Sequence, residues 1–221
     1  MRKSKTWLIF GIGSLVAFAL LSAGILSNAA SLQSFDSSIQ QFFPSFINPT
    51  NTMFMSTFSF FGSPAVSIGL TIIIALAIWL NKNRTMAIWI IFTQIIGSRI
   101  AEIVKNIVQR PRPTLQVIKD TGFSYPSGHT FCTAILIMVI LFIMVPMIND
   151  QEVQALVSIL SVLWFVVIAI SRIYLRDHFP TDVIGSTLLA ISWWEVSRGI
   201  YFFAQKHLAG SKLLANHMKG E

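Results

Sequence analysis

The chain contains little charge for its length. Only 11% of its 221 residues are charged, whereas 54% are hydrophobic, and its mean hydropathy is +0.69. Because soluble domains carry about 25% charged residues, this shortage excludes an ordinary soluble fold. The apolar segments continue along the chain without a polar linker. We therefore predict a single integral-membrane domain that covers residues 1–221.

Cysteine is almost absent as well, since Cys132 is the only one. A single cysteine excludes an intramolecular disulfide and a zinc site of the cysteine and histidine type. Its apolar neighbours indicate a small buried side chain rather than a reactive thiol. We expect no metal, no other cofactor and no obligate protein partner.

A concentrated basic stretch is missing too, although the net charge is +7. Membrane topology or anion binding explains cations at the ends of apolar segments better than nucleic acid does. The loop of residues 27–53 has no Lys or Arg. By the positive-inside rule this loop lies outside, and both termini lie in the cytoplasm, at what we expect to be a bacterial plasma membrane. The cations expected on the cytoplasmic side are Arg2, Lys3, Lys5, Lys82, Arg84, Lys206, Lys212 and Lys219.

Six apolar segments are long enough to cross a bilayer, which takes about 20 residues. In the loop after the first of them, Phe35, Ile39 and Phe42 recur at helical spacing before Pro44. This pattern predicts a short interfacial helix on the outer leaflet, and a loop packed on the bundle would suit it equally well. The sequence thus predicts an all-α, polytopic membrane protein with six transmembrane helices at Trp7–Leu26, Met55–Leu80, Met86–Val108, His129–Met147, Val153–Ile173 and Thr181–Phe203.

Some cations fall on the side that the positive-inside rule disfavours. An anionic ligand would explain why they are kept there. Most of them belong to three polar segments, residues 105–113, 126–129 and 171–182, which helices would gather at one membrane depth. The cations in question are Lys105, Arg110, Arg112, Lys119, Arg172 and Arg176.

The first polar segment suits a phosphate group. Arg112 stands between Pro111 and Pro113, which stop a helix and keep the chain extended. A guanidinium matches two phosphate oxygens at once, whereas Lys105 supplies a point charge. Taken alone, the segment would also suit anchoring to lipid headgroups.

The second polar segment reads as the start of a helix. Pro126 fits a first helical turn, and the amides of Ser127 and Gly128 would then lie at a helix start, which attracts anions. His129 follows on that turn. On its own, such a histidine is more often a helix cap or an interfacial residue.

The third polar segment pairs an imidazole with a carboxylate. His178 and Asp182 are four residues apart, so the carboxylate can reach one ring nitrogen and fix the tautomer. The other ring nitrogen is then free to attack, which favours nucleophilic catalysis. Arg172, earlier in the segment, adds a second guanidinium.

Together the segments form a three-part signature. It reads lysine, six residues, Arg-Pro; then Pro-Ser-Gly-His; then Ser-Arg, five residues, histidine, three residues, aspartate. The signature resembles that of the type 2 phosphatidic-acid phosphatase superfamily, which includes membrane lipid phosphatases and vanadium haloperoxidases. It departs from that pattern at no defining position. The organisation is most like the bacterial phosphatidylglycerophosphatase B type.

The resemblance implies a role for each motif residue. His178 would attack phosphorus to give a phosphohistidine, with Asp182 orienting the ring. His129 would protonate the leaving alkoxide and then activate water. The phosphoryl oxygens would be held by Lys105, Arg112, Arg172 and the amides of Ser127 and Gly128.

The resemblance also implies the reaction. It would be metal-independent hydrolysis of the phosphomonoester of phosphatidylglycerophosphate, taken from the bilayer at its outer face. The alternative is an undecaprenyl pyrophosphate phosphatase, or a broader lipid phosphatase that accepts phosphatidic acid, because the motifs recognise phosphate and not the lipid tail. A lipid-phosphate binder or transporter would need the cations but not the two imidazoles. A vanadium peroxidase conflicts with the membrane composition.

Other charged residues lie close to the motifs. Arg99 and Glu102 form a polar stripe with Lys105 at spacings of three, either as a scaffold ion pair or as part of the site. We expect Arg176 to pair with Asp177 rather than to touch a headgroup. Further along, Glu195 and Arg198 suit an ordinary helix pair, and no function is assigned to His207 and His217.

Overall fold

The computed structural model describes the backbone of residues 5–217 and the side chains of residues 7–207. Within that part of the chain every regular element is helical and no strand occurs, so the predicted all-α class is confirmed. Arg2, Lys3 and Lys219 lie outside the described residues, as do the side chains of Lys5, Lys212 and His217. The α-helices are α1 (Lys5–Leu26), α2 (Ala30–Gln40), α3 (Pro49–Phe61), α4 (Pro64–Leu80), α5 (Arg84–Val108), α6 (Gly128–Val139), α7 (Gln151–Tyr174) and α8 (Pro180–His217).

Four described helices are long and apolar enough to cross a membrane: α1, α5, α7 and the continuous helix Gly128–Met147 that begins with α6. The bent pair of α3 and α4 makes a fifth if it counts as one span. The sequence predicts a sixth span in α8, which does not meet the same measure. Polar side chains such as Ser192, Glu195 and Arg198 dilute the apolar character of α8.

The second predicted span, Met55–Leu80, is not one straight helix. The chain bends by 46° between α3 and α4. Ser63 caps α4 by accepting a hydrogen bond from the Val66 amide at 3.4 Å, and Pro64 in the first turn has no amide hydrogen with which to continue α3. The break therefore has a local cause in the sequence.

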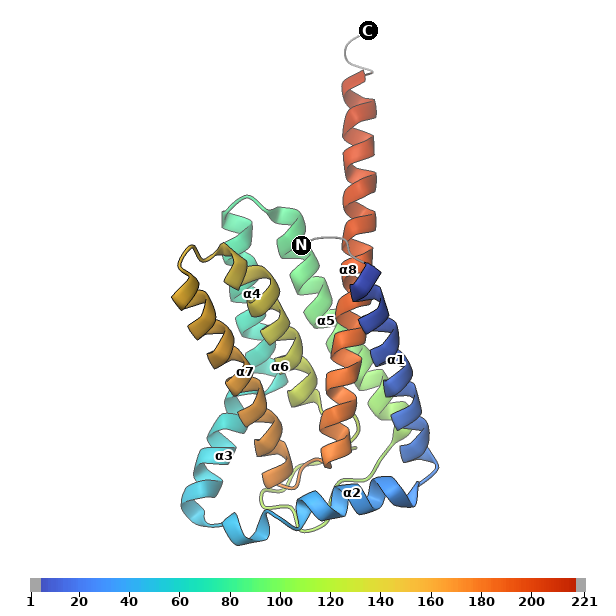
Figure 1. Ribbon diagram of the computed structural model, residues 1–221, viewed down its shortest axis with the longest axis vertical. Coiled ribbons are helices and arrows are strands. Elements are labelled where there is room, and N and C mark those ends of the chain that lie inside the picture. The colour runs from blue at the N-terminus through green and yellow to red at the C-terminus, as the bar shows by residue number, and fades with distance from the viewer. Residues whose placement is uncertain (1–4, 218–221) are drawn as a thin grey trace.

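The bundle is organised around α8, which packs against α1, α5 and α6. Figure 1 shows the later part of α8 projecting well beyond the other helices. The link between α4 and α5 lies at that same end, whereas α2 lies at the opposite end. The opposite end is also where α7 ends and α8 begins.

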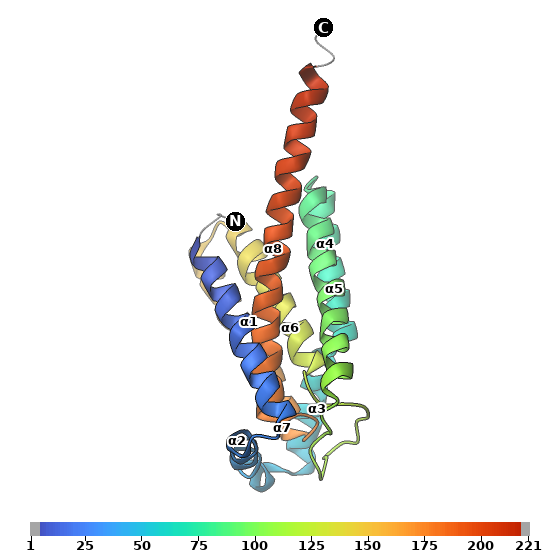
Figure 2. The same cartoon turned by 90° about the vertical axis from the view of Figure 1, so that its right-hand side faces the viewer.

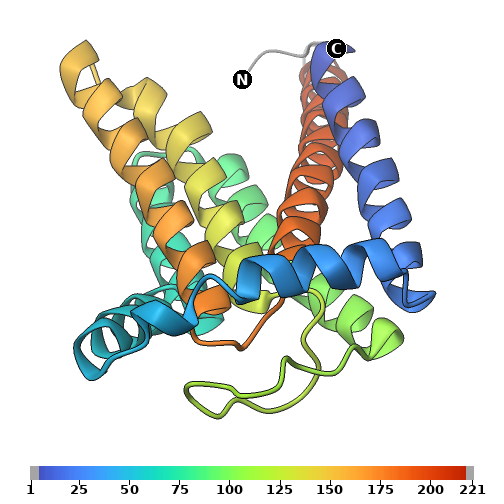
Figure 3. The same ribbon diagram turned by 60° about the horizontal axis from the view of Figure 1, so that its bottom comes forward.

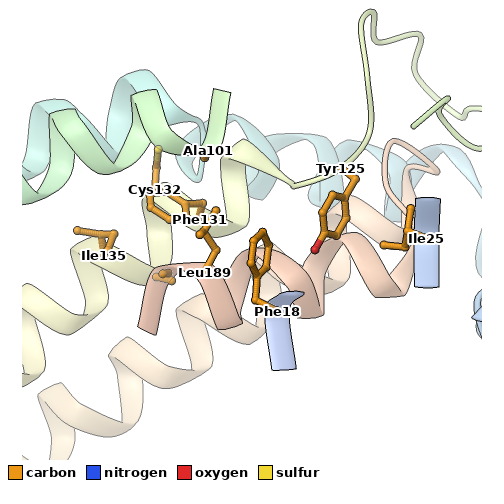
Figure 4. Close-up of a cluster of buried hydrophobic side chains, with 10 residues drawn as sticks. Phe18, Ile25, Ala101, Tyr125, Phe131, Cys132, Ile135 and Leu189 are labelled. Carbon is orange, nitrogen blue, oxygen red and sulfur yellow. The ribbon is translucent and has the colours of Figure 1, made fainter. Parts of the chain in front are cut away.

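A buried cluster of side chains fixes that opposite end (Figure 4). Phe18 of α1 stacks on Tyr125 with ring centroids 6.0 Å apart. The Tyr125 hydroxyl lies 2.7 Å from the Ser22 hydroxyl, so a hydrogen bond joins α1 to the segment before α6. Phe131 and Leu189 continue the cluster on α6 and α8. The start of α6 is thereby held between α1 and α8.

Helix α2 crosses this end of the bundle (Figures 2 and 3). It includes Phe35 and Ile39 of the helix that the sequence predicts in the first loop but ends before Phe42, and it packs on α8. The long loop of residues 109–127 lies at the same end. These two segments enclose the ends of the helices that carry the motif residues.

Candidate active site

The three polar segments meet at one end of the bundle. Helix α5 carries Lys105 in its last turn and ends at Val108, and the next residue, Gln109, has a left-handed φ of 50°. The chain then forms the loop with Arg112, and α6 starts next to it at Gly128. Arg172 lies in the last turn of α7. The structure thus brings residues from four helix ends to a common site.

His178 and Asp182 face each other in the buried part of the site. The distance from His178 Nδ1 to Asp182 Oδ2 is 3.5 Å, and the two residues are 1% and 0% exposed. This distance is longer than an ordinary N–H···O hydrogen bond, so the carboxylate faces the ring without a close contact. The other contact of Oδ2 is the Phe179 amide, which donates to it at 2.9 Å.

Burial sets the charge of His178. It lowers the pKa of the imidazole to about 4, and the positive charges of Arg172 and Lys105 act in the same direction, against Asp182. The ring is therefore neutral near pH 7. A neutral imidazole has the lone pair that a nucleophile requires.

His129 lies on the first turn of α6, half-buried. It is near enough to His178, Arg172 and Lys105 for their charges to act on it. Ser127 caps the helix, since its hydroxyl oxygen accepts hydrogen bonds from the Thr130 amide at 3.4 Å and from the Thr130 hydroxyl at 3.1 Å. The backbone N–H groups of the first turn of α6, which have no carbonyl partner within the helix, point outward from its N-terminus.

A carboxylate joins the two motif arginines. Asp120 Oδ2 lies 3.0 Å from Arg112 Nη1 and 3.2 Å from Arg172 Nη2. Arg112 also donates to the carbonyl oxygens of Thr121 at 2.8 Å and Asp177 at 2.9 Å. Asp120 is 38% exposed on its side chain, in a place where a phosphate oxygen would meet both guanidinium groups. The sequence assigns Asp120 no role.

The expected pair between Arg176 and Asp177 is wrong. Asp177 pairs with Arg172, with Oδ2 to Nη2 at 3.0 Å, while Arg176 donates to the carbonyl oxygen of Gln40 at 3.5 Å. The left-handed φ of 56° at Arg176 ends α7 and turns these neighbours in different directions. Burial raises the pKa of Asp177 to about 6, although Arg172 opposes the shift.

Arg99 and Glu102 do form an ion pair, at 2.7 Å, with side chains that are 70% and 56% exposed. Both residues line a cavity of about 500 Å³ that also reaches Lys105 and Gly128. The rest of the wall is largely apolar and comes from α4, α5 and α6. Its charged groups are therefore Lys105 and the Arg99–Glu102 pair. On α8 the expected pair of Glu195 and Arg198 is also present, at 2.5 Å.

Two residues that the sequence does not assign to the site are bonded to it. Arg110 Nη1 lies 2.6 Å from Asp182 Oδ1, and its Nη2 lies 2.6 Å from Asp36 Oδ2. Arg110 is among the cations that we expect from the sequence on the side disfavoured by the positive-inside rule, and Asp36 is the one acidic residue in residues 27–53. In the sequence, only these two facts draw attention to Arg110 and Asp36. Neither fact identifies the groups that the two side chains contact.

Comparisons with known proteins identify the family of the chain. The PAP2 superfamily matches residues 85–206, more than half of the chain and all three polar segments. Phosphatidylglycerophosphatase B of Bacillus subtilis is 25% identical over 186 residues, which are 82% of this chain and 90% of that protein. Undecaprenyl-diphosphatase of Sulfolobus acidocaldarius is 27% identical over 126 residues, which are 54% of this chain and 56% of that protein.

A solved structure shares the fold. It is the crystal structure of a transmembrane PAP2 type phosphatidylglycerolphosphate phosphatase from Bacillus subtilis, with a TM-score of 0.78 and 24% identity. The likeness covers 89% of this chain and 96% of that one. With the family match over the motif segments, the chain belongs to the PAP2 superfamily.

Proposed function

We propose that this protein is a membrane lipid phosphatase that hydrolyses phosphatidylglycerophosphate to phosphatidylglycerol through a phosphohistidine. One observation carries the proposal. Lys105, whose charge acts on the neutral imidazole of His178, and Gly128 at the start of α6 both line a cavity whose wall is otherwise largely apolar. Such a site receives a phosphate and a lipid tail in one molecule.

The proposed topology has six spans in a single domain of a bacterial plasma membrane. In it α8 crosses the bilayer, shielded from lipid along part of its length by α1, α5 and α6. The link between α4 and α5, which contains Lys82 and leads into Arg84, lies at the end of the bundle opposite the motif segments, which supports a cytoplasmic position for that end and for both termini. Helix α2 would lie in the outer interface, where its exposed Phe35 meets the lipid.

The first half of the reaction forms a covalent intermediate. His178 Nε2 would give its lone pair to phosphorus, while Arg112, Arg172 and Lys105 stabilise the charge on the equatorial oxygens. The P–O bond breaks, and His129 gives a proton to the leaving alkoxide. Asp182 then faces a positively charged, phosphorylated ring. This attraction is stronger than in the free enzyme.

The second half uses the same groups in reverse. His129, now neutral, takes a proton from water, and the oxygen of that water forms a bond to phosphorus. The P–N bond breaks and returns its electron pair to His178, so inorganic phosphate is released and both rings regain their first state. The scheme requires no metal, because the fixed cations neutralise the developing charge.

The direct test is phosphate release from purified protein in detergent with a chelator present. We expect release from phosphatidylglycerophosphate, unchanged when the chelator is omitted. A loss of activity with chelator would contradict metal independence, and no release from any lipid phosphate would contradict the proposal.

A second candidate substrate is undecaprenyl pyrophosphate, which the Sulfolobus relative favours by its name. The same preparation should be assayed on that lipid and on phosphatidic acid. We expect kcat/KM to be highest for phosphatidylglycerophosphate. A value about tenfold higher for the pyrophosphate would favour the second candidate.

The cavity makes a separate prediction about the lipid tail. Ser98 lines its wall on α5, so Ser98→Phe should narrow it. We expect kcat/KM to fall about tenfold for a long-chain lipid phosphate, and to change little for a small, water-soluble phosphomonoester. Ile96→Phe on the same helix, at a residue 38% exposed and outside the cavity wall, is the control. An equal loss on both substrates would show that the cavity does not hold the tail.

A further inference from the structure

We infer that Arg110 and Asp36 are positioning residues of this active site, which hold Asp182 in the rotamer that faces His178 and make that rotamer depend on the docking of α2. The inference rests on the proposed function, because it concerns the carboxylate behind the proposed nucleophile. Arg110 and Asp36 stand outside the three-part signature.

The two oxygens of Asp182 have different partners. Oδ2 faces the His178 ring at 3.5 Å and accepts the Phe179 amide at 2.9 Å, whereas Oδ1 accepts Arg110 Nη1 at 2.6 Å. The terminal torsion of an aspartate is soft by itself. The short, charge-assisted contact on Oδ1 therefore fixes the angle at which Oδ2 meets the ring.

Arg110 is itself held on several sides. Its Nη1 also donates to the Thr181 hydroxyl at 2.7 Å, and its guanidinium lies over the Phe179 ring, 4.0 Å from the centroid. Its carbonyl oxygen accepts the Ser124 amide at 2.8 Å. The side chain is 12% exposed. A planar fork can bridge two carboxylates in this way, and a lysine ammonium cannot.

Asp36 completes the arrangement from α2. It is 1% exposed. Its Oδ1 accepts the Thr181 amide at 2.9 Å, and its Oδ2 accepts the Thr181 hydroxyl at 2.7 Å as well as Arg110 Nη2 at 2.6 Å. A carboxylate from another helix thus caps the start of α8, where the helix dipole favours negative charge.

These contacts give α2 a task beyond covering the bundle. A buried carboxylate needs partners that offset its desolvation, and every partner of Asp36 belongs to Arg110 or to the first turn of α8. If α2 undocks from the bundle, Arg110 loses Asp36 and keeps only Asp182 as a carboxylate partner, so its side chain becomes more mobile. Asp182 then loses its fixed angle to His178. The orientation of the nucleophile is in this way connected to a helix on the surface of the bundle.

The test uses Asp36→Asn, Arg110→Gln and Arg110→Lys in the full chain. We expect kcat on the best lipid substrate to fall about tenfold for Asp36→Asn and about 100-fold for Arg110→Gln, with Arg110→Lys between them and KM nearly constant. Ser34→Asn on the exposed face of α2 and Lys119→Gln in the exposed part of the loop are matched controls that should behave like the wild type.

A double-variant cycle separates positioning from mere stability. If both residues act through Asp182, adding Asp36→Asn or Arg110→Gln to Asp182→Asn should lower kcat little further. A second full loss in that background, or a lowered Tm with unchanged kcat in the single variants, would overturn the inference.

A readout without catalysis keeps this inference distinct from the proposed function. ¹⁵N-histidine NMR reports the tautomer of His178, whose signal is assigned with His178→Gln. We expect the Nδ1–H form in the wild type and a mixture in Arg110→Gln and Asp36→Asn. An unchanged tautomer in both variants would contradict the inference. An inactive wild type with the expected tautomer shifts would contradict the proposed function alone.

Discussion

Replacing His178 with alanine is expected to lower kcat for phosphate release by at least about 10⁴-fold, because no covalent intermediate can form without the nucleophile. Wild-type protein quenched during turnover of a lipid labelled in its terminal phosphate should carry acid-labile, base-stable label. The His178→Ala protein should carry none. Mass spectrometry of the wild-type adduct should place the phosphate on His178.

The matched control is His207→Ala. His207 lies on the distant part of α8 with its ring against Phe203, at a centroid distance of 4.4 Å, and the variant should keep full activity and labelling. Activity above about 1% of wild type in His178→Ala, or label on another histidine, would assign the attack to a different group. Because burial holds the pKa of His178 at about 4, the nucleophile itself should stay neutral down to about pH 5.

His129→Ala is expected to have the next largest effect, a loss of about 10²–10⁴-fold on lipid substrates, whose alkoxide leaving group needs a proton. A substrate with a leaving group that needs none, such as p-nitrophenyl phosphate, should behave differently. Its first step should proceed, while the second step still lacks a base for water. We therefore expect a burst of about one p-nitrophenol per enzyme, followed by slow turnover, measured by stopped-flow absorbance.

The double variant His129→Ala with His178→Ala should show no burst, which proves that the burst reports the covalent step. If His129→Ala alone gives no burst and its loss is the same on both substrates, then its ring positions the phosphate instead of moving a proton. The two histidines would then need new assignments.

Four of the six predicted spans recur as long, apolar helices, because length and hydropathy are local properties of the sequence. The bend between α3 and α4 shows where hydropathy alone misleads. Gly62-Ser63-Pro64 is a helix-breaking sequence, but the apolar residues on both sides of it make the two helices look like one continuous span. Helix α8 is the reverse case. The sequence predicts a span at Thr181–Phe203, but polar side chains leave α8 outside the helices that are apolar enough to cross a membrane. The packing adds that α1, α5 and α6 cover part of α8.

In the site as well, contacts between residues close in the sequence could be predicted and contacts between distant residues could not. His178 and Asp182 could be paired from the sequence because they are only four residues apart, although His178 lies just before α8 and not on its first turn. Arg110 meets Asp36 and Asp182 across sequence separations of 74 and 72 residues, and no local spacing contains that information. The misassigned partner of Asp177 has a similar origin, since the left-handed residue before it directs the carboxylate to Arg172.

Asp120 affects how the site would empty after each turnover. Its carboxylate already bridges Arg112 and Arg172, so a lipid phosphate would have to displace the Asp120 carboxylate in order to bind these arginines. The displaced carboxylate stays attached to the protein by a short loop, which keeps its local concentration near the arginines in about the millimolar range. In the proposed reaction it would return as soon as the P–N bond breaks, and inorganic phosphate would then leave two arginines that regain their own counter-ion. We therefore expect weak product inhibition.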